Sequence, residues 1–110
     1  MSYRVQKVNE LLKQELSVMV KESIPEELGL VTVMDVIATP DFKIAHVFIS
    51  VMVENNEAQI IKILDKKKNG FQKELGRKLK MRYTPKLEFR VDQSKDELNR
   101  IDELLEETRK

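Results

Sequence analysis

The stretch KIAHVFISVMV, residues 43–53, constrains the fold more than any other part of the chain. It contains the longest apolar run, which His46 and Ser50 interrupt and which is too short to cross a bilayer as a helix. Every second residue is apolar, and the residues between are mixed. This alternation predicts a β-strand with one face on the core and the other partly open. The expected core face is Ala45, Val47, Ile49, Val51 and Val53, and the mixed face is Ile44, His46, Phe48, Ser50 and Met52.

Two further segments have the composition or the alternation of strands. Residues 30–39, LVTVMDVIAT, are rich in β-branched side chains, and a Pro40-Asp41 turn should join them antiparallel to the stretch above. Residues 86–91, KLEFRV, alternate cleanly and follow Pro85, which suits the start of a strand. The side chains of this last strand that we expect to face the core are Leu87, Phe89 and Val91.

Three segments carry apolar residues at helical spacing. They predict a helix from Ser2 to about Glu22, a second helix over residues 57–80 and a third over residues 94–110. The three apolar stripes are Val5, Val8, Leu12, Leu16 and Met19; Ile60, Ile61, Leu64, Phe71, Leu75 and Leu79; and Leu98, Ile101, Leu104 and Leu105.

The order of these elements predicts the fold class. A chain of 110 residues is long enough for one domain with a modest core. The order helix, strand, strand, helix, strand, helix predicts an α+β domain of two layers, in which helices cover one face of a three-stranded sheet. We expect residues 1–93 to form this domain, and residues 94–110 to pack on it or extend from it as a C-terminal helix.

Charge is distributed unevenly along a chain that is almost neutral overall. The chain holds 20 bases and 19 acids, for a formal net charge of +1. Residues 22–61 hold one lysine and seven acids, whereas residues 62–82 hold nine bases and two acids. One concentrated basic segment in a neutral chain suggests a local anion-binding face. The chain has no cysteine, which excludes disulfides and thiolate metal sites and suits a reducing cytosol.

The basic segment KKKNGFQKELGRKLKMR, residues 66–82, surrounds an Asn69-Gly70 pair, which commonly ends or bends a helix. Four of its basic side chains cluster within about 60° on a helical wheel, opposite the apolar stripe: Lys66, Lys73, Arg77 and Lys80. Nucleic-acid phosphates are natural partners for such a row, and a second helix starting at the pair would add anion-binding N–H groups. A lysine-rich outer helix face is more often solvated surface, so charge alone leaves both interpretations open.

Three other lysines of this segment fall outside the basic row. Lys67 and Lys78 lie nearer the edge of the apolar stripe, and Lys68 falls on its apolar side. Either the stem of Lys68 extends outward along the surface, or the helical register shifts at Gly70 and Lys68 joins the basic row. We favour the shift.

Catalytic and metal-binding patterns do not stand out. His46 and Ser50 share a strand face but are separated by about 13 Å of strand rise, too far for a base to activate a nucleophile. There is no P-loop and no GxGxxG, and no metal-ligand spacing among Asp35, Asp41 and Asp92. Base stacking by Tyr83 or Phe42 has no support from their spacing. We therefore expect no enzymatic activity, no cofactor and no metal.

Over roughly residues 2–106, the chain resembles bacterial ribosome-binding factor A. The resemblance starts with RVQKVNELLKQELS and continues with VMDVIATPDFKIAHVFISV. It is most specific in NGFQKELGRKLKMRYTPKLEFRVDQS followed by RIDELL. The features that match together are the glycine-led basic helix, the Arg-Tyr-Thr-Pro entry to a strand and the Leu-x-Phe-x-x-Asp-x-Ser tail.

The resemblance implies a KH-like domain of the type II topology, which agrees with the order of elements above. Family members replace the usual KH GxxG loop with an Ala-x-Gly kink between two helices. The corresponding positions here are Lys68, Asn69 and Gly70, so the glycine is kept and a lysine replaces the alanine. The kink is therefore expected at Asn69 and Gly70, with extra positive charge beside it.

The resemblance also implies a function. Such proteins are non-catalytic assembly factors that bind the free small (30S) ribosomal subunit late in its maturation and contact its 16S rRNA. They leave before translation, matter most in the cold, and are expected to be cytoplasmic monomers with neither a membrane nor a small-molecule partner. The RNA-binding residues carried over by position are Lys66, Lys67, Lys68, Lys73, Arg77, Lys78, Lys80 and Arg82, with Arg4 and Lys7 as weaker candidates.

A protein-interaction module of the same α+β shape is the alternative. It would use the acidic C-terminal helix or the open sheet face with Ile44, Phe48 and Met52. The response to salt separates the two functions, because binding through phosphates weakens steeply as salt is added and binding through an apolar interface does not.

Overall fold

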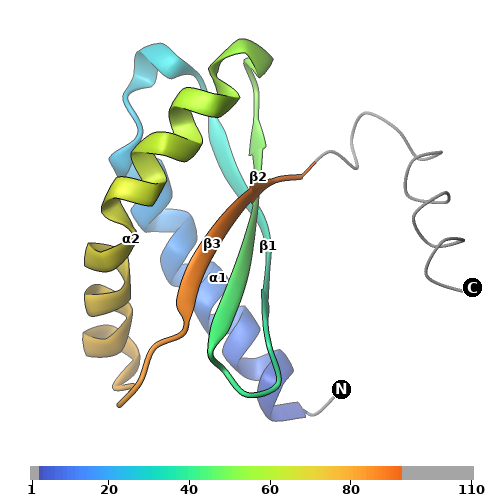
Figure 1. The fold of residues 1–110 in the computed structure, drawn as a ribbon, viewed down its shortest axis with the longest axis vertical. Helices are drawn as coiled ribbons and strands as arrows, with labels where there is room; N and C mark the ends of the chain where they lie inside the picture. The colour runs from blue at the N-terminus through green and yellow to red at the C-terminus, as the bar shows by residue number, and fades with distance from the viewer. Residues whose placement is uncertain (1–2, 93–110) are drawn as a thin grey trace, which may run out of the picture.

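The computed structural model describes residues 3–92, which form two helices, three strands and two 3₁₀ turns (Figure 1). In chain order these are α1 (Tyr3–Ser23), a turn (Glu26–Leu28), β1 (Val31–Ala38), β2 (Ile44–Val51), a turn (Glu54–Asn56), α2 (Glu57–Leu79) and β3 (Lys86–Val91). Each helix and strand expected within this range is present, with bounds that differ from expectation by at most two residues. The expected C-terminal helix over residues 94–110 lies outside the described residues.

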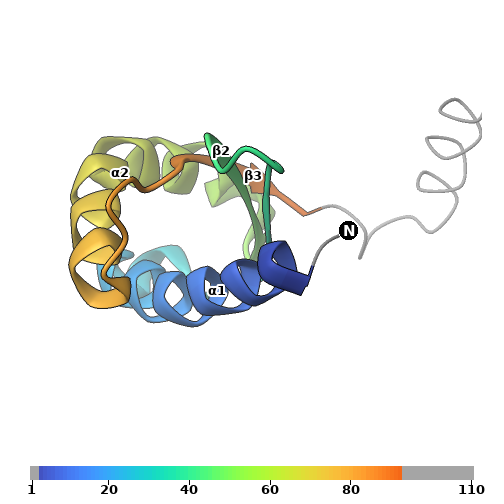
Figure 2. The same ribbon diagram turned by 90° about the horizontal axis from the view of Figure 1, so that it is seen from below.

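The three strands form one sheet in the order β1–β2–β3, with β1 and β2 antiparallel and β2 and β3 parallel. Parallel neighbours need a crossover connection, and α2 provides it. Figures 1 and 2 show both helices on the same side of the sheet, with α1 behind it in Figure 1 and α2 beside β3. The expected α+β architecture, consistent with a KH-like fold, is therefore confirmed.

The core lies between the two helices and the sheet. The largest fully buried side chains come from every helix and strand: Leu12, Leu16 and Val20 from α1; Val36, Val47, Ile49 and Leu87 from the strands; and Ile60, Leu64 and Leu75 from α2. Each aliphatic side chain of this kind stabilises the fold by about 1.5–3 kcal/mol relative to an exposed one. All of these except Val20 and Val36 lie on the stripes and strand faces that the sequence predicts. Val20 lies outside the stripe predicted for the first helix, and no core face was predicted for residues 30–39.

One core prediction for β2 is wrong. Val53 was expected to face the core but is exposed, because β2 ends at Val51 and a 3₁₀ turn begins at Glu54. The mixed face of the strand is partly open as expected, since its residues from Ile44 to Ser50 are half-buried and Met52 is exposed.

A β-bulge in β1 is a feature that the strand composition did not predict. Val33 pairs with Ile49 and Asp35 with Phe48, so Met34 is an extra residue in β1. Val33 and Val36 are three residues apart and would face opposite sides of a regular strand. Both are buried, because the inserted residue restores the alternation on the core side.

The second helix continues through the Asn69-Gly70 pair. It is unbroken from Glu57 to Leu79, although Figure 1 shows its axis changing direction partway along. The helix N-terminus that could have formed at Gly70 is therefore absent, and Gly70 offers no free N–H groups of a helix start to an anion.

Replacing Gly70 by alanine should stabilise the protein. A Cβ atom at Gly70 would meet nothing within 4 Å, and glycine inside a helix is less favourable than alanine by about 0.5–1 kcal/mol. Urea denaturation of Gly70→Ala should show a gain of this size. Gly29→Ala is the matched contrast and should lose stability, because Gly29 has a φ of 92° and its Cβ would lie 3.0 Å from Val53 Cγ2. A loss in Gly70→Ala would show that the bend in α2 requires glycine.

Candidate nucleic-acid interface

The outer side of α2 carries a row of exposed basic side chains. Phe71 and Leu75 are buried on the inner side of the helix, while the opposite side presents Lys66, Lys73 and Arg77 to solvent. We call these three residues the basic ridge. Arg77 forms an exposed ion pair with Glu74 one turn away, which adds little stability and leaves the Arg77 side chain 71% exposed.

Lys80 does not belong to this row, contrary to the helical-wheel prediction. The helix ends at Leu79, and Lys80 is the C-cap in the left-handed conformation, with a φ of 53°. Its backbone N–H donates to the carbonyl oxygen of Gly76, and the N–H of Met81 donates to the same oxygen over 3.0 Å. The chain therefore turns away at Lys80, which places that side chain at the end of the helix.

Lys67 and Lys78 lie on the side of α2 that faces α1. Lys67 Nζ donates to the backbone oxygen of Ser23 over 3.5 Å, and Lys78 Nζ lies 3.3 Å from Glu15 Oε1. These two contacts connect α2 to α1. The position near the edge of the apolar stripe, which the wheel predicted for both, agrees with these contacts.

The remaining candidates lie in different places. Lys68 is half-buried within the unbroken helix and stays outside the basic ridge, so the register shift that we favoured at Gly70 is wrong. Lys7 is exposed on α1. The Arg4 guanidinium lies 5.8 Å from the centre of the Phe42 ring. Lys62 was not among the candidates, but it is exposed on α2 and falls within about 40° of Lys66 on the same helical wheel, which could have identified it.

A groove lies at the end of the molecule that Figure 2 views, where three segments far apart in the sequence meet. We call it the terminal groove. It has a volume of about 780 Å³ and is lined by Arg4, Val8, Asp41, Phe42, Lys43, Lys80, Met81, Arg82, Tyr83 and Thr84. Four of these side chains are basic and one is acidic. The groove brings Arg4, Lys80 and Arg82 together and adds Lys43, which no local pattern in the sequence identified.

The turn between β1 and β2 holds the acidic side chain of this groove in a fixed position. The Thr39 hydroxyl donates to Asp41 Oδ1 over 2.7 Å, and the Lys43 backbone N–H donates to the same oxygen over 3.1 Å. These two hydrogen bonds, the one from Thr39 first, lower the pKa of Asp41 below its usual value. The carboxylate therefore stays charged and is directed at its own turn.

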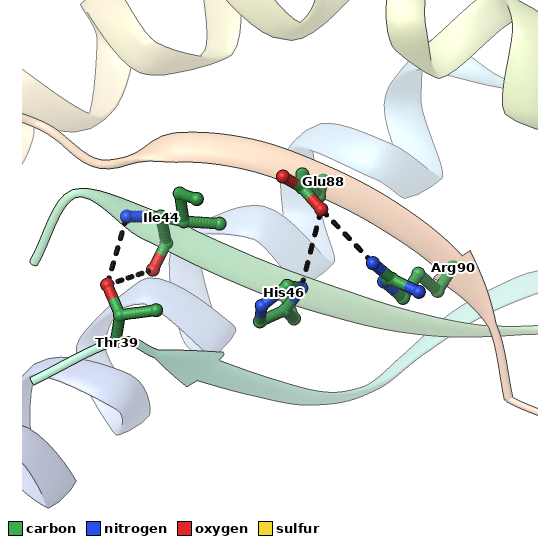
Figure 3. A network of polar contacts seen from close by, with 5 residues as sticks. All are labelled: Thr39, Ile44, His46, Glu88 and Arg90. Carbon is green, nitrogen blue, oxygen red and sulfur yellow. Dashed lines mark hydrogen bonds and ion pairs between the residues drawn. The ribbon is translucent and has the colours of Figure 1, made fainter.

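The open face of the sheet carries a polar network (Figure 3). Glu88 Oε1 on β3 lies 3.6 Å from His46 Nδ1 on β2 and 3.2 Å from an Arg90 guanidinium nitrogen. Nearby, the Thr39 hydroxyl contacts both the backbone N–H and the carbonyl of Ile44, each over 3.2 Å. The face is thus mixed along β2 and β3, where these polar side chains lie beside the half-buried Ile44 and Phe48.

Within residues 3–92, His, Cys, Asp and Glu side chains do not gather in any group of three or more that could hold a metal ion. Over the same range, neither helix combines the length and the apolar character needed to span a membrane.

The three-stranded sheet, its two helices on one face and its exposed basic residues define a small α+β protein of the KH-like class. The family model for ribosome-binding factor A matches residues 4–105. The chain therefore belongs to the ribosome-binding factor A family.

Two curated relatives show the extent of the similarity. The chain is 37% identical to ribosome-binding factor A of Desulforamulus reducens over 109 residues, which covers 97% of this chain and 91% of the relative. It is 36% identical to ribosome-binding factor A of Thermodesulfovibrio yellowstonii over 108 residues, covering 97% and 92%.

Solved structures support the same fold. The crystal structure of ribosome-binding factor A from Thermus thermophilus superposes with a TM-score of 0.71 at 24% identity and covers 79% of this chain and 94% of that one. A Thermus thermophilus model of this factor, fitted into a cryo-electron microscopy map of a 30S complex, superposes with a TM-score of 0.65 at 20% identity, covering 88% and 100%.

Proposed function

We propose that this protein is a non-catalytic ribosome assembly factor that binds the free 30S subunit during its late maturation. The observation that carries the proposal is the family match, which extends over residues 4–105. A Thermus thermophilus relative has been placed in a map of a 30S complex, and that protein has the same fold as this chain. In this role the protein acts by binding 16S rRNA while processing of the rRNA is completed, and it leaves before translation.

The basic ridge is the surface that we propose for the main RNA contacts. Lys66, Lys73 and Arg77 are exposed together, and their helix is held from behind by buried residues such as Leu75. Contacts of this kind neutralise phosphates and position the protein, but they carry little sequence information. Specificity then comes from the shape of the folded RNA. We further propose that the protein acts as a cytoplasmic monomer and is needed most in the cold.

Co-sedimentation with ribosomal particles at low and moderate salt tests this function. We expect the protein to migrate with free 30S subunits and to dissociate as salt rises, because each phosphate contact contributes a slope of about −0.7 to −0.9 in log K against log salt. Absence of the protein from the 30S fractions at every salt concentration would contradict the proposal. Salt-insensitive association would favour an apolar interface on the open sheet face instead.

A further inference from the structure

We infer that the terminal groove binds one unpaired RNA nucleotide, with its base against Tyr83 and its phosphate among the basic side chains of the rim. The inference rests on the proposed function, in that RNA is the partner, and it assigns a second kind of contact in addition to the basic ridge. The groove volume of about 780 Å³ lies within the range of about 300–1,000 Å³ that is typical of small-molecule sites.

The aromatic side chains of the groove provide stacking surfaces. Tyr83 is 78% exposed, and the Arg82 guanidinium lies 5.7 Å from the centre of its ring. Phe42 is half-buried against the core and has the Arg4 guanidinium 5.8 Å from its ring centre. Unpaired bases stack on aromatic rings and on arginine planes, and the groove offers both. Tyr83 is the better platform, because Phe42 is already partly covered.

The backbone around the groove is unusual for side chains of this size. Among residues 3–92, Phe42 and Lys80 are the non-glycine residues with positive φ, at 59° and 53°, and both line the groove. This conformation is uncommon for a large side chain. It is retained because the N–H of Phe42 donates to the carbonyl of Thr39 over 2.8 Å and the N–H of Lys80 donates to that of Gly76. The two turns hold the walls of the groove in place.

The charge of the groove suits a phosphate. Arg4, Lys43, Lys80 and Arg82 come from the N-terminal end of α1, the β1–β2 turn and the loop before β3. The one acid, Asp41, is engaged by the hydroxyl of Thr39 and the N–H of Lys43. Four positive charges and one negative charge give the groove a net positive charge, which would attract an anion bound between the three segments.

Geometry favours an unpaired nucleotide over a duplex in this groove. In an A-form helix, the bases are stacked on one another and their faces cannot reach a side chain such as Tyr83. A duplex would instead present its phosphates to an exposed row such as the basic ridge. The two surfaces are therefore expected to contact different parts of one RNA, paired at the ridge and unpaired at the groove.

Tyrosine fluorescence gives a direct test. The chain has two tyrosines and no tryptophan, so a Tyr3→Phe variant leaves Tyr83 as the only strong emitter. A short single-stranded oligouridine should quench this emission on binding, and a blunt-ended RNA duplex without unpaired nucleotides, at equal phosphate concentration, should quench it much less. Unchanged emission at saturating oligouridine would overturn the assignment.

The second test measures the affinity for labelled oligouridine by fluorescence anisotropy. Tyr83→Ala should weaken binding about 5- to 150-fold, the range expected when one stacked base is lost, while Tyr83→Phe should bind as the wild type does. Equal affinities for Tyr83→Ala and the wild type would contradict the inference. Because the probe contains no ribosomal particle, a protein that binds oligouridine through Tyr83 but never joins 30S subunits would retain this site and lose only the proposed function.

Discussion

Reversal of the basic ridge should abolish co-sedimentation with 30S subunits. The variant combines Lys66→Glu, Lys73→Glu and Arg77→Glu, and leaves Lys80 intact because that residue lines the terminal groove. A charged contact contributes about 1 kcal/mol or more, so losing three should weaken binding on the order of 100-fold. For the binding that remains, the slope of log K against log salt should also become less negative by about two to three.

The fold should survive this change, so that the loss can be attributed to the surface. All three positions are exposed, and glutamate has a helix propensity close to that of lysine. The lost Arg77–Glu74 pair and the new like-charge neighbours should each cost only a few tenths of a kcal/mol. Circular dichroism and urea denaturation should confirm a folded helical protein close to wild-type stability.

A matched reversal elsewhere separates local contact from net charge. Lys13→Glu, Lys21→Glu and Lys86→Glu make the same change in net charge at exposed positions on α1 and β3. This control should still migrate with 30S subunits at low salt. An equal loss in both triple variants would mean that binding responds to overall charge, and the basic ridge would then have no special part in it.

The sequence predicted those parts of this fold in which the pattern of side chains is local. Leu87 and Phe89 alternate over one short strand, and both are buried as expected. Leu12 and Leu16 lie on one helical stripe and are fully buried. In each case burial of apolar surface and the period of the element favour the same structure, so a short window of residues contains the answer.

The sequence did not predict features that depend on pairing or on how elements end. The bulge at Met34 shows only when β1 is paired with β2. Lys80 has the spacing of the basic row but leaves it because the helix stops one residue earlier. A helical wheel assumes that the helix continues, and it contains no information about the left-handed cap.

The candidate site illustrates the same limit. The basic ridge lies on one helix, so a helical wheel could predict it from the sequence. The terminal groove joins Arg4, Phe42 and Tyr83, which are far apart along the chain and share no motif. Spacing therefore offered no support for base stacking, and only the fold places these side chains around one hollow.

Truncating a core leucine of α1 should have the largest effect on stability of any change considered. Leu16 is fully buried between the helices and the sheet. Removing its side chain to Cβ loses apolar burial and leaves a cavity, so Leu16→Ala should lower the free energy of unfolding by about 2–5 kcal/mol. The free energy of unfolding of a small domain is only about 5–15 kcal/mol in total, so the loss should be visible as a fall in the urea midpoint and in Tm.

Val18→Ala is the matched control for this experiment, two residues further along the same helix. Val18 is 52% exposed, and alanine is the better helix former, so its effect should stay within about 0.5 kcal/mol of zero. Where Leu16→Ala remains folded, it should bind 30S subunits as the wild type does, because the ridge and the groove are intact. Comparable losses in the two variants would place the core elsewhere than between α1 and the sheet. Lost binding by folded Leu16→Ala would show that 30S binding depends on how α1 packs on the core, because Leu16 itself is buried and cannot contact RNA.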